Sequence, residues 1–191
     1  MRREADRLAA LVDDLFELSR IQAGSLTLRF EPVPLDELVS DAIAGAAMAA
    51  AVKDITLQES VTRPAPVVEV STPDMTRVVR NLLDNAIRHT PRGGVVTVDA
   101  GPDDVDRSGD AIIVSVQDGC GGIPEHDLDL VFELAYRGDA ARTPGDGGDG
   151  GGGGLGLAVA RGLVEAHHGD ITVRNVDRGC RFTVRLPRRR Q

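Results

Sequence analysis

Apolar residues recur at three- and four-residue steps in several segments of the chain, and this spacing predicts helices. The first is residues 3–22, an amphipathic helix that Gly24 is positioned to end. Residues 35–52 form a second, alanine-rich helix. A third helix begins at Thr72 and runs through the asparagine-containing stretch 81–89.

Shorter segments alternate apolar and polar residues and therefore predict β-strands. They are residues 26–30, 55–58, 67–70, 95–100, 112–116, 170–174 and 181–186, and the last two are expected to form a hairpin. Pro32 and Pro34 are expected to interrupt the chain after the first strand, and residues 124–132 are expected to add a short helix. Together these elements predict an α+β fold. It is a two-layer sandwich with one mixed, mostly antiparallel sheet, helices on one face, and the N-terminal amphipathic helix in addition.

The N-terminal helix leaves two arrangements open. A single helix of about 20 residues is marginally stable in water unless another surface covers its apolar stripe. The stripe consists of Leu8, Leu11, Val12, Leu15, Leu18 and Ile21. Either the helix folds back on the main domain, or it forms one arm of a helical bundle.

The helix through residues 81–89 carries an unusual polar face. Asn81, Asn85 and Arg88 share it at i, i+4 and i+7, although Asn disfavours helix interiors because its amide competes for backbone hydrogen bonds. One interpretation is an ordinary solvated face. The other is a site for a polyanion with its metal, since amide oxygens ligate hard cations and Arg contacts phosphate.

Two glycine-rich turns in the second half of the chain favour the polyanion site. The stretch 116–124 reads as a strand that ends at Asp118 and continues into a glycine turn. Further on, the glycines 150–154 lead into Leu155 and Gly156 and then into a helix. A glycine loop that opens a helix presents backbone N–H groups, which suit a phosphate.

The asparagine helix, the Asp-Gly turn and the Gly-to-helix loop, in this order, resemble the catalytic ATP-binding domain of sensor histidine kinases. This is the Bergerat fold, shared with gyrase B and the heat-shock chaperone ATPases. The resemblance implies that residues 25–191 form the catalytic domain, with ATP and Mg²⁺ as cofactors. Residues 1–24 resemble the second helix of the dimerisation and phosphotransfer hairpin in that family. The first helix of that hairpin, with its phosphorylated histidine, is not seen in this sequence.

The resemblance implies a role for individual residues around the base and the metal. Asp118 would accept a hydrogen bond from the exocyclic amine of adenine, with Gly122 and Ile123 beside the base. Asn85 would ligate Mg²⁺ and Asn81 would lie next to it. The sequence departs from the family pattern at Cys120, which stands where the first glycine of the Asp-x-Gly-x-Gly motif is expected.

Further residues are implied at the phosphates and over the base. Gly154, Leu155 and Gly156 would offer backbone amides, and Gly153 stands where the family often has Ser or Thr. Three side chains extend this set: Arg88, where Lys is common; His89, where an aromatic ring commonly covers the nucleotide; and Arg137, which would reach the γ-phosphate. For His89 a helix-end histidine, and for Arg137 a surface arginine, are the alternatives.

Residues 138–154 combine Gly, Asp and Pro with almost no apolar side chains. This composition is typical of a disordered linker. A long loop inside a compact domain is more often functional, and in the resembled family this position is the ATP lid.

His167 and His168 are neighbours in the sequence and could suggest a metal pair. Neighbouring residues in a helix point about 100° apart, however, so the end of a helix before Gly169 is expected instead.

Charge and cysteine content narrow the choice of partner and compartment. The net charge of −8 argues against nucleic acid as a partner. Cys120 and Cys180 have no metal-site spacing, and two reduced thiols in the cytoplasm are the simplest expectation, with a disulfide as the alternative. The longest apolar run is too short to span a bilayer, so the chain is expected to be cytoplasmic even if its parent kinase is membrane-bound.

The sequence therefore predicts that the chain holds ATP and Mg²⁺ and donates a phosphoryl group to a histidine in two-component signal transduction. The expected partners are a histidine-bearing helix or hairpin and a downstream response regulator, with dimerisation only through the hairpin. Alone, the chain is expected not to phosphorylate itself. The rival functions are a slow ATP hydrolase of the same fold, an anti-sigma-type Ser kinase and a degenerate interaction module. Asn81 stands where gyrase-like hydrolases carry a catalytic Glu, which argues against fast hydrolysis.

Overall fold

The computed structural model describes residues 2–103, 111–134 and 154–188. Its elements follow the chain in the order α1 (Arg2–Gln22), β1 (Glu31–Pro34), α2 (Leu35–Val52), β2 (Thr56–Val61), β3 (Val67–Val70), α3 (Thr72–His89), β4 (Val95–Pro102), β5 (Ala111–Gln117), the 3₁₀ turn η1 (Glu125–Asp127), α4 (Gly156–Ala166), β6 (Asp170–Val176) and β7 (Gly179–Pro187). The segment 124–132, expected to be a short helix, contains only the 3₁₀ turn followed by further turns.

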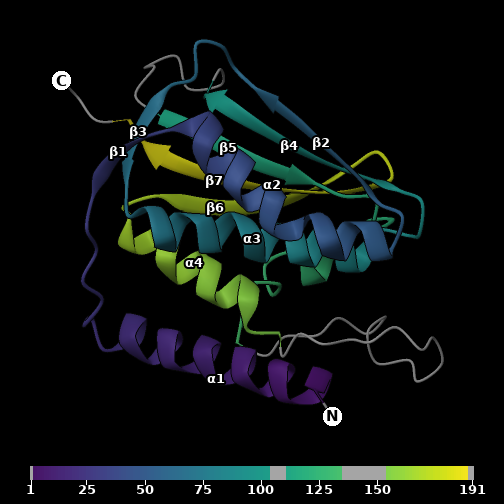
Figure 1. Ribbon diagram of the computed structural model, residues 1–191, viewed down its shortest axis with the longest axis horizontal. Helices are drawn as coiled ribbons and strands as arrows, with labels where there is room; N and C mark the ends of the chain where they lie inside the picture. The colour runs from purple at the N-terminus through teal and green to yellow at the C-terminus, as the bar shows by residue number, and fades with distance from the viewer. Residues whose placement is uncertain (1, 104–110, 135–153, 189–191) are drawn as a thin grey trace.

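The α+β two-layer architecture is confirmed. Five strands form the main sheet in the order β2-β4-β5-β7-β6, in which the β2–β4 pair is parallel and the other pairs are antiparallel. Helices α2, α3 and α4 cover one face of this sheet, and α1 lies beyond α4 (Figure 1). The sequence predicted one sheet, whereas the described strands form two, because β1 and β3 pair only with each other.

The first strand was predicted in the wrong place. Residues 26–30 form no strand, and β1 consists of the next residues, including Pro32 and Pro34. Proline lacks an N–H but is tolerated in an edge strand, where that group would otherwise face solvent. The prolines therefore do not interrupt this strand, which pairs with β3 through the register Val33 to Val68.

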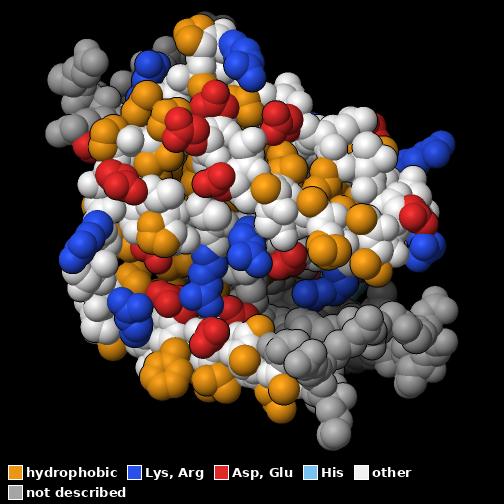
Figure 2. Space-filling model, viewed as in Figure 1, with side chains coloured by type: hydrophobic (Ala, Val, Ile, Leu, Met, Phe, Trp, Pro, Cys, Tyr) orange, Lys and Arg blue, Asp and Glu red, His pale blue; other side chains and the backbone are white. Residues whose placement is uncertain are grey.

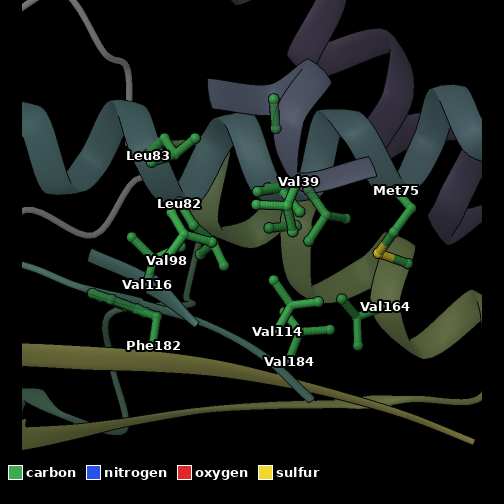
Figure 3. Close-up of a cluster of buried hydrophobic side chains, with 14 of the residues drawn as sticks. Val39, Met75, Leu82, Leu83, Val98, Val114, Val116, Val164, Phe182 and Val184 are labelled. Atoms are coloured by element: carbon green, nitrogen blue, oxygen red, sulfur yellow. The ribbon is translucent and has the colours of Figure 1, made fainter. Parts of the chain in front are cut away.

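The core lies between the helical layer and the inner face of the main sheet. Figure 3 shows Leu82 and Leu83 of α3 and Val39 of α2 on the helical side, opposite valines of the strands. The set is aliphatic, as the low aromatic content predicts, and its fully buried members include Val39, Met75, Leu82, Leu83, Val98, Val114, Val116 and Val184. Phe182 adds one ring from β7, which meets Phe132 edge to face at 6.0 Å.

Helix α1 folds back against the helical layer and also keeps an exposed apolar side. Leu18 is buried, and Arg77 of α3 pairs with Asp14 at 2.9 Å and with Glu17 at 3.2 Å. On the outer side Leu8, Val12, Leu15 and Phe16 are 52% to 69% exposed. Figure 2 shows apolar side chains along this outer side of α1. The contact with α3 and α4 therefore covers only half of the predicted stripe.

The end of α1 at Gly24 is also as predicted. Gly24 has φ of +61°, and the N–H of Ser25 donates to the carbonyl of Arg20 at 3.0 Å. A positive φ after the last turn is the usual glycine C-terminal cap of a helix. None of the helices in the described ranges combines the length with the apolar character that crossing a membrane requires.

Candidate functional site

Helix α3 separates its apolar and polar faces as the sequence predicts. The face toward the sheet is fully buried at Met75, Val78, Val79, Leu82, Leu83 and Ala86. Asn81 and Asn85 are half-buried on the other face, and Arg88 is exposed one turn further on. The apolar face fixes the rotation of the helix, because burial of those side chains is favourable only in this orientation. The polar stripe is thereby presented outward.

Asn81 links this stripe to the glycine turn before α4. Its side-chain Nδ2 donates a hydrogen bond of 2.9 Å to the backbone carbonyl of Gly156. Gly154 has φ of +73°, a left-handed conformation that favours glycine, and Gly156 begins α4. The structure therefore brings Asn81 and the residues 154–156 together, so that the N-terminus of α4 meets the polar face of α3.

The carboxylate of Asp118 is held at the end of β5. It is 5% exposed, and its Oδ1 accepts hydrogen bonds from the backbone N–H groups of Cys120 and Cys180, both at 3.0 Å. Burial raises the pKa of Asp118, and the two backbone N–H donors partly oppose that rise. Both of these bonds go to Oδ1, so neither of the two donors uses Oδ2.

Two residues that sequence reasoning missed position this loop. Thr90, at the end of α3, accepts a hydrogen bond from the N–H of Gly119 through its hydroxyl at 3.1 Å. Asn175 of β6 pairs with the backbone of Ile123, accepting from its N–H and donating to its carbonyl, each at 2.8 Å. No local pattern identifies these partners, because they lie 29 and 52 residues from the groups they contact.

The replacement of glycine by Cys120 is compatible with the backbone of this turn. Positive φ angles occur at Gly121 (+86°) and Gly122 (+101°), whereas Cys120 is not among the residues with positive φ. Only the two glycines therefore need the conformational freedom that a side chain would restrict. The position of Cys120 accepts an ordinary L-residue, so the departure from the glycine pattern needs no left-handed conformation at this residue.

The expectation of two separate reduced thiols is wrong in this structure, since Cys120 and Cys180 form a disulfide. The two cysteines meet because Cys120 follows β5 and Cys180 lies near the start of β7, and these strands are paired. Donor atoms of Asp118, Cys120 and Cys180 lie within 4.8 Å of one another, a spacing that can suit a metal. As a disulfide, however, the sulfurs are not thiolate ligands.

Three basic side chains gather at the C-terminal end of α3: Arg88 and His89 of the helix itself, and Lys53, which follows α2. The Nζ of Lys53 donates hydrogen bonds to the carbonyls of Ile87 and Arg88. A charged side chain therefore satisfies two of the last carbonyls of the helix. Loss of hydration, together with the charges of Arg88 and Lys53, lowers the pKa of the partly exposed His89. The lowered pKa favours the uncharged form of the His89 ring at neutral pH.

The candidate site extends along α3 between these two ends. Asn81 meets the glycine turn at one end and Thr90 meets the Asp118 loop at the other. Nine residues at a rise of about 1.5 Å each separate them by about 13 Å. Arg137, Gly153 and most of the proposed lid, 138–154, lie outside the described residues.

The His167–His168 pair is not a metal site in this structure. His167 is 2% exposed, accepts a hydrogen bond at Nε2 from the N–H of Ser71, and has Nδ1 2.7 Å from the carbonyl of Leu163. Because Nε2 is an acceptor, the proton lies on Nδ1 and is donated to Leu163. Burial lowers the pKa of His167, as expected for a neutral ring that ties the end of α4 to the start of α3.

Gly179 offers a test of how closely β7 approaches Asp118. A Cβ at this position would lie 1.8 Å from the Asp118 carbonyl oxygen, so Gly179→Ala must displace the backbone. We expect the free energy of unfolding, measured with urea, to fall by about 2 kcal/mol or more. The matched control is Gly45→Ala in α2, where the new Cβ meets only the flexible Arg80 side chain at 3.5 Å. This control is expected to gain about 0.5–1 kcal/mol, and equal effects of the two substitutions would contradict the prediction.

Comparison with known proteins identifies the family to which this fold belongs. Residues 71–190 match the family described as histidine kinase-, DNA gyrase B- and HSP90-like ATPases. SenX3, a sensor-like histidine kinase of Mycobacterium tuberculosis, is 35% identical over 185 residues, covering 96% of this chain and 43% of SenX3. The chain spans less than half the length of the curated relatives that it matches.

Two solved structures share the fold. Full-length ShkA in complex with AMPPNP superposes with a TM-score of 0.82 at 25% identity, covering 98% of this chain and 37% of ShkA. The histidine kinase ThkA in complex with the response regulator protein TrrA superposes with a TM-score of 0.76 at 22% identity, covering 98% of this chain and 49% of ThkA. Both matches include α1 as well as the sheet and its helices, because only 2% of this chain lies outside them.

Proposed function

Because the chain belongs to the family of histidine kinase-, DNA gyrase B- and HSP90-like ATPases, we propose that it binds ATP with Mg²⁺ and donates the γ-phosphoryl group to a histidine in two-component signalling. The observation that carries this proposal is the polar face of α3. At one end of this face lies the loop with the buried carboxylate of Asp118. At the other end lies the glycine turn that begins α4. An extended nucleoside triphosphate has a base to be read at one end and phosphates to be held at the other.

The residues at the base end suit adenine. Asp118 presents Oδ2 as an acceptor, which matches the exocyclic amine of adenine and not the carbonyl that guanine carries at the same position. Gly122 and Ile123 lie in the same turn, and His89 contributes a mainly uncharged ring from the end of α3. The relative ShkA was crystallised with AMPPNP, which supports a nucleotide at this site.

The residues at the phosphate end suit Mg²⁺ and anionic oxygens. Asn85 is half-buried on the polar face of α3, and its amide forms no hydrogen bond to another described residue. An amide oxygen is a suitable ligand for this hard cation, which when bound neutralises phosphate charge. Arg88 and the backbone amides of Gly154, Leu155 and Gly156 would hold phosphate oxygens, and the N-terminal end of α4 favours negative charge.

Asn81 favours phosphoryl transfer to a partner over hydrolysis. Its amide donates to the Gly156 carbonyl, so this side chain ties the glycine turn to α3. An amide cannot act as a general base that activates water. The second candidate function, an ATP hydrolase of the same fold, therefore lacks the base that it would need at this position, and its turnover is expected to be slow.

We propose a histidine-bearing hairpin as the direct partner and a response regulator as the downstream one. Helix α1 would be the second helix of such a hairpin, with its exposed Leu8, Val12, Leu15 and Phe16 covered in a dimer. ThkA was solved together with the response regulator TrrA, which supports the downstream partner. The proposed location is the cytoplasm, where ATP and a response regulator are both present.

The test is transfer of label from γ-labelled ATP to a separately supplied hairpin that bears the histidine. The chain alone is expected to bind ATP without phosphorylating itself. His167 is buried with both ring nitrogens engaged. In the described structure His126 is the histidine with an acidic neighbour in contact, 3.4 Å from Asp127. The expected result is acid-labile label on the added hairpin only, and His126 is the position to examine for stray label on the chain itself.

His126→Ala is the control for this experiment, since it removes that acidic pair from an exposed side chain. The proposal would be contradicted if the wild-type chain alone became labelled at the rate of an intact kinase. If that label were absent from His126→Ala, His126 would be the acceptor. Failure of the hairpin to accept label while calorimetry shows bound ATP would also contradict it.

A further inference from the structure

The disulfide between Cys120 and Cys180 lies directly at the proposed base-reading carboxylate. The two half-cystines are the same residues whose backbone N–H groups donate to Oδ1 of Asp118, each at 3.0 Å. The N–H of Asp118 also donates to the Cys180 carbonyl at 3.0 Å. The covalent bond therefore joins the two donors that orient one carboxylate, across a sequence separation of 60 residues.

The two cysteines differ in freedom of movement. Cys180 is fully buried in β7, where it pairs with Asn175 of β6, and Gly179 before it has no space for a side chain. Cys120 is partly exposed in the loop, where its sulfur accepts a hydrogen bond from the N–H of Gly122 at 3.3 Å. A change in the bond between them must therefore move the loop and leave the strand in place.

We propose that the Cys120–Cys180 pair is a reversible redox switch that sets the affinity of the site for ATP, with the disulfide as the high-affinity state. The inference rests on the proposed function. Two thiols cannot stay at bonding distance, so reduction pushes Cys120 away from β7. This displaces one of the two N–H donors of Asp118 together with the turn at Gly121 and Gly122, and the carboxylate loses its fixed orientation.

The chemistry is thiol–disulfide exchange with a small thiol. A thiolate attacks the accessible sulfur of Cys120, and a mixed disulfide forms while Cys180 leaves as a thiolate and takes up a proton. A second thiol then attacks the mixed disulfide, which releases the small-molecule disulfide and leaves Cys120 as a thiol. Two electrons and two protons pass to the protein from two thiol molecules, and an oxidised small-molecule disulfide reverses the reaction. In a reducing compartment such pairs are typically transient and redox-sensing.

The experiment measures ATP binding by calorimetry, with Mg²⁺ present, on the chain equilibrated with oxidised or reduced glutathione. Mass spectrometry verifies the two states by the difference of two hydrogens. Reduced protein is expected to bind ATP about tenfold more weakly, the loss expected when one hydrogen bond to a charged group is broken. Reoxidation should restore the affinity. Prior treatment with a chelating resin ensures that a metal held by the two thiols and Asp118 does not imitate the effect.

Cys120→Ser is the matched variant. It is expected to bind ATP with the affinity of the reduced wild type in both buffers. Equal affinity of the oxidised and reduced wild type would overturn the switch and leave the proposed function standing. Free thiols after exposure to oxidised glutathione would overturn it as well. Absence of ATP binding in both states would instead overturn the proposed function, and the switch with it.

Discussion

Asp118→Asn is expected to lose ATP affinity by about 100-fold or more, equivalent to about 2.7 kcal/mol, and to remain fully folded. The asparagine Oδ1 can still accept from the N–H groups of Cys120 and Cys180, so the loop keeps both hydrogen bonds. At the position of Oδ2, however, an N–H₂ group now faces the amine of adenine, and two donors meet. Guanine carries an acceptor there, so the variant should shift its preference toward GTP.

The stability of this variant should depend on pH in a defined direction. Burial raises the pKa of Asp118, so the ionised carboxylate costs folding free energy at any pH above that raised value. Asparagine carries no such cost. The unfolding temperature at pH 7 is therefore expected to be equal to or higher than that of the wild type. The gain should shrink as the pH falls and the wild-type carboxyl becomes protonated.

The control for Asp118→Asn is Asp127→Asn, a similarly buried carboxylate at 6% exposure in the 3₁₀ turn η1. This control should bind ATP within about twofold of the wild type, because Asp127 is not among the residues proposed to contact the nucleotide and its ion pair is with the exposed His126. Calorimetry with ATP and GTP, together with thermal unfolding, decides the question. Wild-type affinity for ATP in Asp118→Asn would refute the role of the carboxylate in binding, and an unfolded variant would refute the expectation that the fold does not depend on its charge.

Asn85→Ala should remove the part of ATP binding that depends on Mg²⁺. Alanine is a better helix former than asparagine, so α3 should not be weakened. With Mg²⁺ in excess, the affinity is expected to fall at least about tenfold, and transfer to a supplied hairpin to fall further, about 100-fold. With the metal chelated, the variant and the wild type should bind ATP equally.

Arg80→Ala serves as the control for Asn85→Ala. Arg80 is exposed on α3 on the side toward α2, where it lies near Gly45. Its loss should leave both the affinity and the dependence on Mg²⁺ unchanged. The assignment of Asn85 to the metal would be wrong if the Mg²⁺ titration of Asn85→Ala followed that of the wild type.

Features with a local cause were predictable from the sequence. The apolar period of α3 places Asn81, Asn85 and Arg88 outward, and the glycine at position 24 ends α1 where the pattern stops. Asp118 at a strand end followed from the alternation of the preceding residues. In each case a few neighbouring residues decide the conformation, so a short window of sequence contains the information.

Features that depend on distant partners were not predictable. Thr90 and Asn175 hold the Asp118 loop through bonds to residues far along the chain, and nothing in their own neighbourhood marks them. The pairing of Cys120 with Cys180 follows from the register of β5 and β7, which the spacing of the cysteines does not reveal. The second small sheet was not predicted, because Pro32 and Pro34 were expected to interrupt the chain and instead lie in the edge strand β1.

Helix α3 connects helix α1 to the candidate site mechanically. Arg77, Asn81 and Asn85 follow one another at intervals of four residues, so the arginine that grips Asp14 and Glu17 of α1 lies on the same line as the candidate metal ligand. A helix of 18 residues is stiff over this length and behaves as one rod. We therefore expect a displacement of α1 that moves Arg77 to move α3 as a whole. Both ends of the proposed nucleotide site would then be displaced together with the helix.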